Sequence, residues 1–237
     1  MGKFLSALAL VATLTACSTK IHGLRQSPSF SYVNLVNGKL VIGGVAESAG
    51  PLDEGTRSGY SALLRDALQE NGKEYPVSSV EVVMEKLGLQ YDRIVNELQQ
   101  VGSLSDESLR TLRRALPDTR YVAFARIENN EVTTDRSETQ DSEKIVATAN
   151  RNVTASLNIY DLELAEIAWS GTVSKTMGSS RQYTREKERG FARVLTAIKG
   201  PYTSAAEQKY PYPPPPGTQQ VLTKVFEGFG EHLPTRH

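Results

Sequence analysis

Residues 145–160 read IVATANRNVTASLNIY, and this stretch decides the fold class. Apolar and polar side chains alternate along it, and its apolar row consists of Ala149, Val153, Ala155, Leu157 and Ile159. A period of two predicts a long β-strand with one buried face and one face in water. Arg151 interrupts the apolar row near its start.

The segments on either side predict partner strands for residues 145–160. Residues 121–127 (YVAFARI) begin with four apolar side chains, which is typical of a central strand covered on both faces. Residues 161–166 are expected to form a turn, and residues 167–175 (IAWSGTVSK) to return as a second partner. The three segments together predict an antiparallel meander.

The first half of the chain predicts alternating strands and helices. Residues 39–45 (KLVIGGV) are expected to form a buried strand, with residues 30–36 paired beside it through a turn at Asn37-Gly38. Residues 56–70 carry apolar side chains at i, i+3, i+4, i+7 and i+8, which predicts a helix. A short strand at 75–77 follows, then a helix that Ser78 or Ser79 caps, a helix at 91–101 and one that begins after Ser105. We therefore expect an α/β fold (an α+β sandwich) in which helices pack on a mixed sheet with a C-terminal antiparallel meander.

Three further elements are expected after the meander. Thr184 should cap a helix whose apolar stripe is Phe191, Val194, Leu195 and Ile198. Residues 210–217 (YPYPPPPG) predict a polyproline II segment, because proline cannot donate a backbone hydrogen bond to a helix or a central strand. A last short helix is expected to carry Val221, Leu222, Val225 and Phe226.

The N-terminal residues have the layout of a secretory signal peptide. Lys3 supplies a positive charge, and residues 4–14 (FLSALALVATL) form an apolar run too short for a permanent transmembrane helix. Residues 14–17 (LTAC) resemble the lipobox of bacterial lipoproteins, which implies cleavage before Cys17 and acylation of its thiol and amino group. Each buried chain methylene contributes roughly 0.8 kcal/mol, so more than one chain makes a stable membrane anchor. The alternative is a chance free thiol in a hydrophobic leader.

These features define the expected regions and location of the protein. We expect a signal peptide (residues 1–16), a lipidated tether (17–29), an α/β periplasmic domain (30–200), and a Pro-rich segment with a C-terminal helix (201–237). Ser18 stands where an aspartate would resemble an inner-membrane retention signal, which implies the periplasmic face of the outer membrane. Cys17 is the only cysteine, so no disulfide is expected.

The composition and the motif search argue against several functions. Lys+Arg and Asp+Glu both number 27 and no basic cluster occurs, so we expect no nucleic-acid partner. No G-x-S-x-G elbow or phosphate-binding loop is present. His22, His232 and His237 lie in the expected tether and tail, so we expect no metal site and no cofactor. We therefore predict that the protein is not an enzyme, although an envelope hydrolase with paired carboxylates stays an alternative because such a pair leaves little sequence trace.

Two segments are candidates for binding another envelope protein. Residues 128–143 form an expected polar loop whose acidic side chains include Glu131, Asp135, Glu138 and Asp141. A solvated hairpin tip accounts for the same residues without a partner. Tyr210 and Tyr212 with the surrounding prolines offer a preformed aromatic ligand surface, and a rigid spacer is the alternative interpretation.

Several short sequence segments resemble those of one family of periplasmic domains. They are LVIGGV (40–45), YSALLRDALQ (60–69), YVAFARIE (121–128) and NVTASLNIYDLELAEIAWSGTVS (152–174), the last with Asp161 and Trp169 around its turn. The domain is shared by the curli secretion lipoprotein CsgG, the flagellar lipoprotein FlgO, the peptidoglycan-synthase activator LpoB and the N-terminal domain of TolB. The resemblance implies a non-catalytic accessory or assembly factor for an envelope machine, and it transfers no catalytic residue.

The same resemblance raises an alternative function. In the curli secretion family, amphipathic hairpins inserted in this domain build a secretion channel, and such strands need an apolar row toward lipid. Residues 128–144 are polar on both faces and contain no aromatic side chain. A channel subunit is therefore disfavoured but stays the second interpretation, and self-association of the chain is left open.

Overall fold

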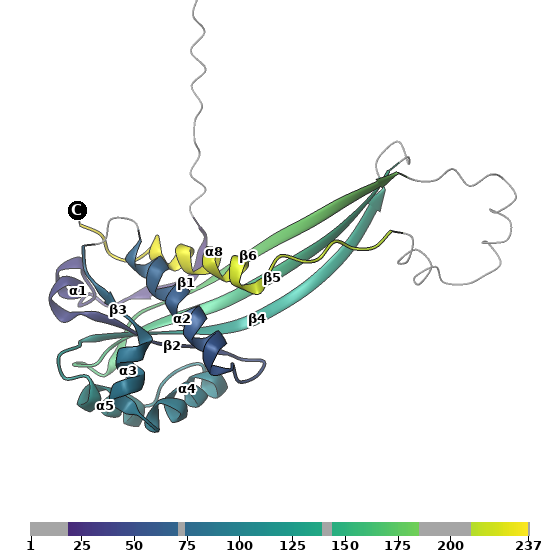
Figure 1. Ribbon diagram of the computed structural model, residues 1–237. Coiled ribbons are helices and arrows are strands. Elements are labelled where there is room, and N and C mark those ends of the chain that lie inside the picture. Colours follow the sequence, from purple (N-terminus) through teal and green to yellow (C-terminus); the bar gives the residue numbers. More distant parts are fainter. Residues whose placement is uncertain (1–18, 71–73, 139–143, 185–209, 237) are drawn as a thin grey trace, which may run out of the picture.

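A six-stranded mixed sheet forms the centre of the protein (Figure 1). The computed structural model describes residues 19–70, 74–138, 144–184 and 210–236. The strands are β1 (Ile21–Gln26), β2 (Leu40–Glu47), β3 (Val77–Ser78), β4 (Tyr121–Glu138), β5 (Lys144–Asp161) and β6 (Glu166–Thr184). Their order is β1-β6-β5-β4-β2-β3, with β2 parallel to β3 and β4 and the other pairs antiparallel. This arrangement confirms the predicted fold class.

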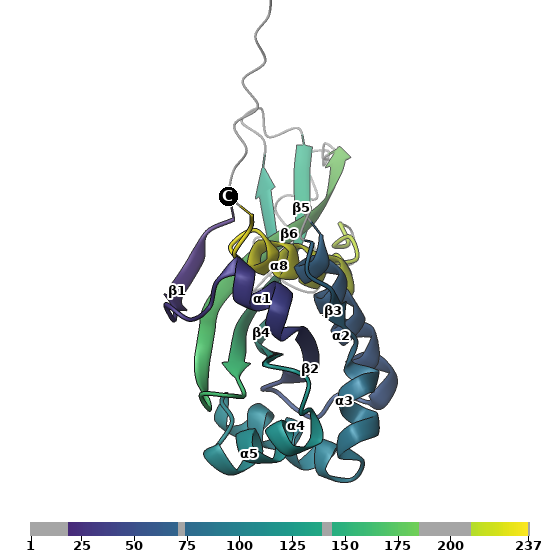
Figure 2. The same cartoon turned by 90° about the vertical axis from the view of Figure 1, so that its left-hand side faces the viewer.

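Helices cover both faces of the sheet in the body of the molecule (Figures 1 and 2). They are α1 (Tyr32–Gly38), α2 (Glu54–Gln69), α3 (Val80–Leu87), α4 (Gln90–Val101), α5 (Asp106–Ala115) and α8 (Thr218–Gly230). Helices α2 and α8 lie side by side on one face, where Phe229 of α8 packs edge-to-face on Trp169 of β6. On the opposite face, Tyr91 of α4 lies against Gly44 of β2.

The helix boundaries follow the capping residues. The side chain of Asp53 accepts a hydrogen bond from the Thr56 N–H at the start of α2, and Ser105 does the same for Ser108 in α5. Gly102 ends α4 in the left-handed conformation, with φ of +81°. The helices expected at residues 56–70, 91–101 and after Ser105 are therefore confirmed.

The strand expected at residues 30–36 is wrong, because this segment forms α1. The Ser31 hydroxyl accepts a hydrogen bond from the Asn34 N–H and caps the helix, and Leu35 is buried. At its start, Leu40–Val41, strand β2 has β3 on one side and β4 on the other, so these residues offer no free edge to a further strand.

The tether expected over residues 17–29 differs in part from the structure. Residues Ile21–Gln26 form β1, which pairs with β6 although all but its first residue are exposed. Backbone hydrogen bonds to the open edge of β6 require no apolar periodicity, and the sequence therefore shows no signal of this strand. Cys17 and the expected signal peptide lie outside the described residues.

Strands β4 and β6 are longer than expected. Residues 128–138 continue β4 instead of forming a loop, and β6 runs on to Thr184. Both faces of residues 128–138 carry polar side chains, so no contrast between faces reveals the strand in the sequence. The helix expected to follow Thr184 lies outside the described residues.

The sequence also predicts a core of Trp169, Tyr160, Phe124, Leu157, Leu63 and Leu64, and the structure largely confirms it. Trp169, Tyr160, Phe124, Leu157 and Leu64 are almost fully buried, and Leu63 is partly buried against the same cluster. The last helix is also confirmed, because Val221, Leu222, Val225 and Phe226 of α8 are buried. None of the helices in the part of the chain that the structure describes has the length and hydrophobicity needed to cross a bilayer.

Leu157→Ala should lower the free energy of unfolding by about 2–5 kcal/mol, because its side chain is 0% exposed and its loss leaves a cavity. Leu89, which is 97% exposed, provides the control, and Leu89→Ala should stay within about 0.5 kcal/mol of the wild type. Chemical denaturation measures both, and equal losses would contradict the assigned core.

Candidate functional site

The most distinctive part of the molecule is a three-stranded ribbon that extends from the body (Figure 1). We define the arm as residues 129–138 of β4, 144–154 of β5 and 174–184 of β6. These strands stay in register to their ends, where Glu138 is opposite Ile145 and Lys144 is opposite Thr184. The arm carries its three strands away from every described helix except the start of α8 (Figure 1).

Both outer edges of the arm lack a neighbouring strand among the described residues. Strand β2 pairs with β4 only as far as Ile127, and β1 pairs with β6 only as far as Val173. A strand edge without a neighbour presents unpaired N–H and C=O groups, which template the addition of another strand. The arm therefore offers two edges for β-strand addition.

The two edges carry opposite charge. Glu131, Asp135 and Glu138 lie on the β4 edge, which has Arg136 as its one cation among residues 129–138. On the β6 edge, residues 174–184 contain Lys175 and Arg181 and no acidic residue. The β4 edge is acidic and the β6 edge is basic.

One face of the arm is a layer of hydroxyl and amide groups that none of the described elements covers (Figure 1). The hydroxyls of Thr154 and Ser174 are 2.9 Å apart, and the side-chain oxygen of Asn152 accepts from Ser174 and Thr176 at 3.2 Å. These bonds run across β5 and β6 and hold the polar side chains in a regular array. This is the wet face that the alternation of residues 145–160 predicts.

The other face of the arm is covered by residues 210–217, which we define as the proline strap (Figure 1). Pro213 and Pro216 are buried, three residues apart, which matches the three-residue turn of a polyproline II helix. Arg136 donates to the Tyr210 carbonyl at 2.8 Å, and its guanidinium lies 4.1 Å from the centre of the Tyr212 ring. The predicted polyproline segment is thus a strap packed along the sheet.

Arg151 explains the interruption in the apolar row of β5. Its Nε donates to the Pro216 carbonyl at 2.7 Å, and its Nη1 donates to the Asn130 side chain at 2.7 Å. The Asn130 amide in turn contacts the Thr218 hydroxyl at 3.5 Å. Arg151 therefore fixes the point where the strap ends and α8 begins, a role that the sequence indicated only as a break in the pattern.

The structure brings the two predicted partner-binding segments together. Glu131, Asp135 and Glu138 lie on the β4 edge, and Tyr210 and Tyr212 cover the face of the same arm through Arg136. Asp141, the remaining predicted residue, lies outside the described residues. The acidic segment is therefore an edge strand and the aromatic segment is its cover, and a partner for either stays a prediction.

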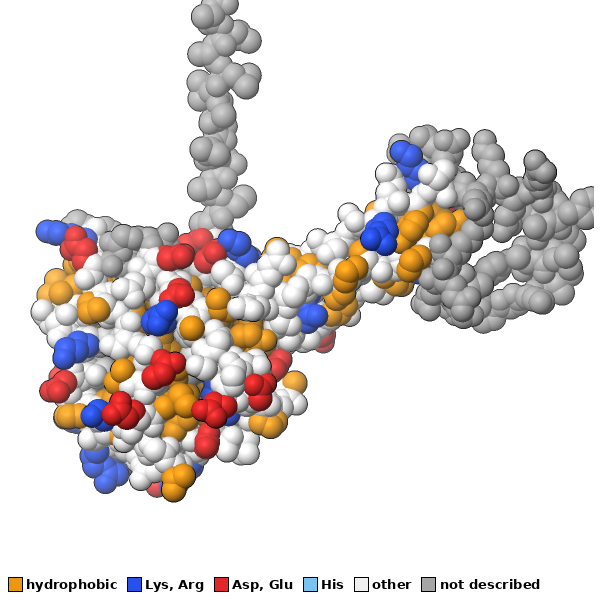
Figure 3. All heavy atoms as spheres, in the orientation of Figure 1, with side chains coloured by type: hydrophobic (Ala, Val, Ile, Leu, Met, Phe, Trp, Pro, Cys, Tyr) orange, Lys and Arg blue, Asp and Glu red, His pale blue; other side chains and the backbone are white. Residues whose placement is uncertain are grey.

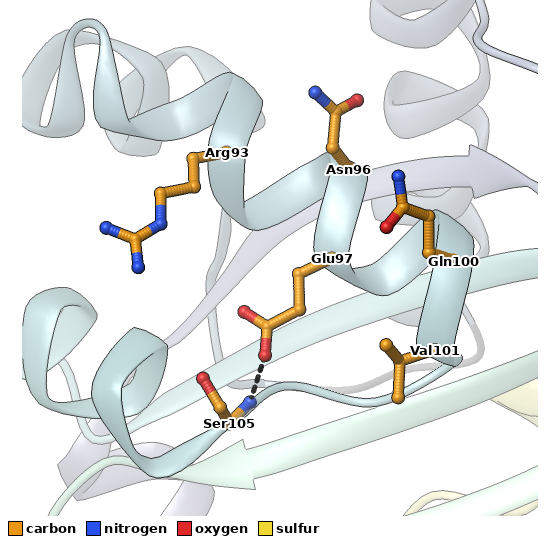
Figure 4. Close-up of a pocket in the computed structure, with 6 residues that line it drawn as sticks. All are labelled: Arg93, Asn96, Glu97, Gln100, Val101 and Ser105. Atoms are coloured by element: carbon orange, nitrogen blue, oxygen red, sulfur yellow. Dashed lines mark hydrogen bonds between the residues drawn. The ribbon is translucent and has the colours of Figure 1, made fainter.

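A shallow hollow lies between α4 and the start of α5 (Figure 4). It has a volume of about 560 Å³ and is lined by Arg93, Asn96, Glu97, Gln100, Val101 and Ser105. The Glu97 carboxylate accepts from the Ser105 N–H at 2.7 Å and from the Ser108 hydroxyl. Burial raises the pKa of Glu97, but the hydrogen bonds from Ser108 and Ser105 outweigh it and the net pKa is lowered.

A second hollow lies where α2 and α8 begin. It measures about 550 Å³ and is lined by Asp53, Gly55, Thr56, Gly59, Tyr60, Gly217, Thr218 and Gln219. The Asp53 carboxylate accepts from the Thr56 hydroxyl and N–H, and these bonds lower its pKa. Asp53 and Glu97 are the single carboxylates of their hollows and both bind helix N-termini, so neither hollow offers the paired carboxylates that a hydrolase needs. Within the described ranges, no group of three His, Cys, Asp or Glu residues is placed to hold a metal ion.

No protein-family model and no curated protein matches the sequence. Similar solved structures include the PelC dodecamer from Paraburkholderia phytofirmans, with 13% identity over 89% of this chain and 96% of that chain and a TM-score of 0.37. The lipoprotein GNA1162 from Neisseria meningitidis has 16% identity over 72% of this chain and 96% of that chain, with a TM-score of 0.37. The LpoB C-terminal domain from Salmonella enterica has 16% identity over 59% of this chain and 83% of that chain, with a TM-score of 0.35. Likeness at these TM-scores carries no inference about this chain.

Arg136→Ala should lower the free energy of unfolding by about 1–2 kcal/mol, because it removes hydrogen bonds to the strap and the contact with Tyr212. Arg110→Ala, on the exposed surface of α5, is the control and should change it by less than about 0.5 kcal/mol. Urea unfolding compares the two variants. The strap would not be held through Arg136 if both lost the same amount.

Glu97→Gln should lower the free energy of unfolding by about 1 kcal/mol at neutral pH, because a charged acceptor of two hydrogen bonds is replaced. The folded pKa of Glu97 is lowered, so its contribution is present above the unfolded pKa and is lost as the pH falls through the folded value. The difference between variant and wild type should therefore shrink in acid. Chemical denaturation over a series of pH values measures this difference, with Glu85→Gln on α3 as the control. A loss of unfolding free energy in Glu97→Gln that does not change with pH would contradict the prediction.

Proposed function

We propose that the protein is a lipoprotein of the outer membrane that faces the periplasm and acts without catalysis, by binding another envelope protein through its arm. The observation that carries the proposal is the arm itself, whose two edges have no neighbouring strand among the described residues. A role as an accessory or assembly factor follows from binding without catalysis. Membership of the CsgG, FlgO, LpoB and TolB group stays an expectation, which rests on the sequence segments that resemble that family.

The membrane anchor in this proposal is Cys17. Acylation of Cys17 is supported by the positive charge of Lys3, the short apolar run and the LTAC motif at residues 14–17. Acyl chains hold a protein at a membrane without a spanning helix. The periplasmic face of the outer membrane rests on the resemblance of the lipobox and on Ser18.

The binding mode in this proposal is β-strand addition at the β4 edge. Main-chain hydrogen bonds supply affinity in this mode, and the side chains along the edge supply specificity. Glu131 and Asp135 are exposed on this edge, so the partner segment should be extended and basic. Both side chains are exposed and lie in the arm rather than in the body, so they can serve recognition without loss of the core.

A second candidate function is a subunit of a secretion channel that assembles arm to arm. The opposite charges of the β4 and β6 edges favour this candidate, because the acidic edge of one copy complements the basic edge of the next. Such a contact joins two different surfaces, so it generates a closed ring or an open filament. The size of the native assembly separates this candidate from the accessory role.

The test is the native mass of the full lipidated protein, extracted from membranes in mild detergent. We expect a complex with one other envelope protein, and Glu131→Lys with Asp135→Lys should dissociate it because the edge then repels a basic segment. Glu85→Lys with Asp118→Lys makes the same change of charge at exposed positions outside the arm and should leave the complex intact.

The outcomes separate the proposals. A ring-sized assembly of this chain alone, lost in the edge variant, would replace the accessory role by the channel subunit. A monomer in the wild type, or a complex that the edge variant does not affect, would reject binding through the β4 edge. Circular dichroism of both double variants shows whether the fold survives the change.

A further inference from the structure

The first described residue is fixed firmly to the body. Thr19 is only 6% exposed, and its N–H donates to the Glu231 carboxylate at 2.9 Å. Its hydroxyl accepts from Nζ of Lys175 at 3.0 Å. Its methyl group lies so close to Gly228 that a Cβ at that glycine would be 2.5 Å from it. Thr19 therefore sits at a defined place, between the C-terminal end of α8 and β6.

This place limits the distance between the body and the lipid anchor. Cys17 precedes Thr19 by two residues, and two extended residues span at most about 7 Å. If Cys17 is acylated, as the proposed function requires, the surface around Thr19 must lie at the lipid headgroups. The anchor thus determines how the whole molecule faces the membrane.

The arm lies on the same side of the molecule as this surface. In Figures 1 and 2, which share a vertical axis, the start of β1 and the far ends of β4, β5 and β6 all lie toward the top. Helices α3, α4 and α5 lie at the bottom in both views. A membrane that touches the body at Thr19 therefore lies on the same side of the molecule as the far end of the arm, and α3–α5 lie on the opposite side.

The side chains at the far end of the arm suit a membrane–water interface. The rings of Tyr183 and Tyr210 are in contact, with centroids 5.6 Å apart. Lys144, which is opposite Thr184, and Arg181 are exposed in the same end of the arm. Figure 3 shows Lys or Arg side chains and hydrophobic side chains together on the arm. Tyrosine rings favour the headgroup level because one end is apolar and the other polar. Lysine and arginine lay their apolar stems along such a surface and place their charges among anionic headgroups.

We propose that the far end of the arm, which comprises Lys144, Arg181, Tyr183 and Tyr210, is a second contact with the bilayer that holds Cys17. The inference rests on the lipid anchor of the proposed function. It adds that the arm lies against the headgroups, so the partner that adds to its edges is met at the membrane surface. The occupant of this surface is anionic lipid, and a protein that covers it instead is an outcome of the test.

The experiment uses the full lipidated chain in vesicles of phosphatidylethanolamine and phosphatidylglycerol. Cys17 is the only cysteine and its thiol is consumed by acylation, so an introduced cysteine is the sole free thiol. Gln182→Cys places an environment-sensitive fluorophore at the far end of β6, and Arg110→Cys places it on α5 as the control, since both positions are exposed. A nitroxide lipid reports contact with the bilayer, and aqueous iodide reports contact with water.

We expect the nitroxide lipid to quench the fluorophore at position 182 and iodide to quench the one at position 110. Adding Arg181→Glu should reduce the nitroxide quenching at 182, whereas Arg114→Glu on α5 should not. Equal quenching by iodide at both positions would overturn the inference, and so would a site at 182 that neither quencher reaches, because a protein then covers it.

Flotation of the vesicles separates this inference from the proposed function. If wild type floats and Cys17→Ser does not, the anchor is established, and the quenching experiment then shows whether the arm contacts the bilayer. If wild type fails to float, the lipid anchor of the proposed function is rejected and the inference falls with it.

Discussion

Strand β5 pairs with β6 from Lys144 to Asp161 and with β4 from Ile145 to Asp161, and the rest of the structure depends on this pairing. A strand paired on both sides has every backbone polar group satisfied whether or not a helix covers it. The meander can therefore continue past the helices without leaving the backbone polar groups of its central strand unpaired. The arm exists because β4 and β6 extend as far as β5 does.

The two ends of β5 meet different surroundings. At the body end Asp161 is fully buried, and its carboxylate accepts from Arg120 at 2.8 and 2.9 Å and from the N–H groups of Glu163 and Leu164. These bonds fix the turn into β6 and satisfy a buried charge. At the arm end the strap supplies the cover that helices supply in the body. A ribbon of three strands needs a packed hydrophobic face to be stable in water, and the strap packs on that face.

The packing of Thr19 changes the expected role of the N-terminal residues. A flexible tether would let the domain face the membrane in any orientation, whereas a buried Thr19 and the paired β1 permit few. If Cys17 is acylated as proposed, the body would stand between the membrane at Thr19 and the water around α3–α5. In that orientation, a partner that binds the arm edges would meet the protein beside the membrane surface, as the proposed accessory role requires.

The sequence by itself determined the mixed fold, most element boundaries in the body and the core around Trp169 and Leu157, because in those places one face is buried and the other is not. It also indicates both segments of the candidate site, but it predicts a loop at residues 128–143 and a separate surface for the proline segment. Only the tertiary structure decided that these segments form one arm. A polar strand and a proline-rich strap carry no periodic burial signal of their own. Their structure comes from partners distant in the chain, such as Arg136 to Tyr210 and Arg151 to Pro216, and a local pattern does not encode which distant residues will meet.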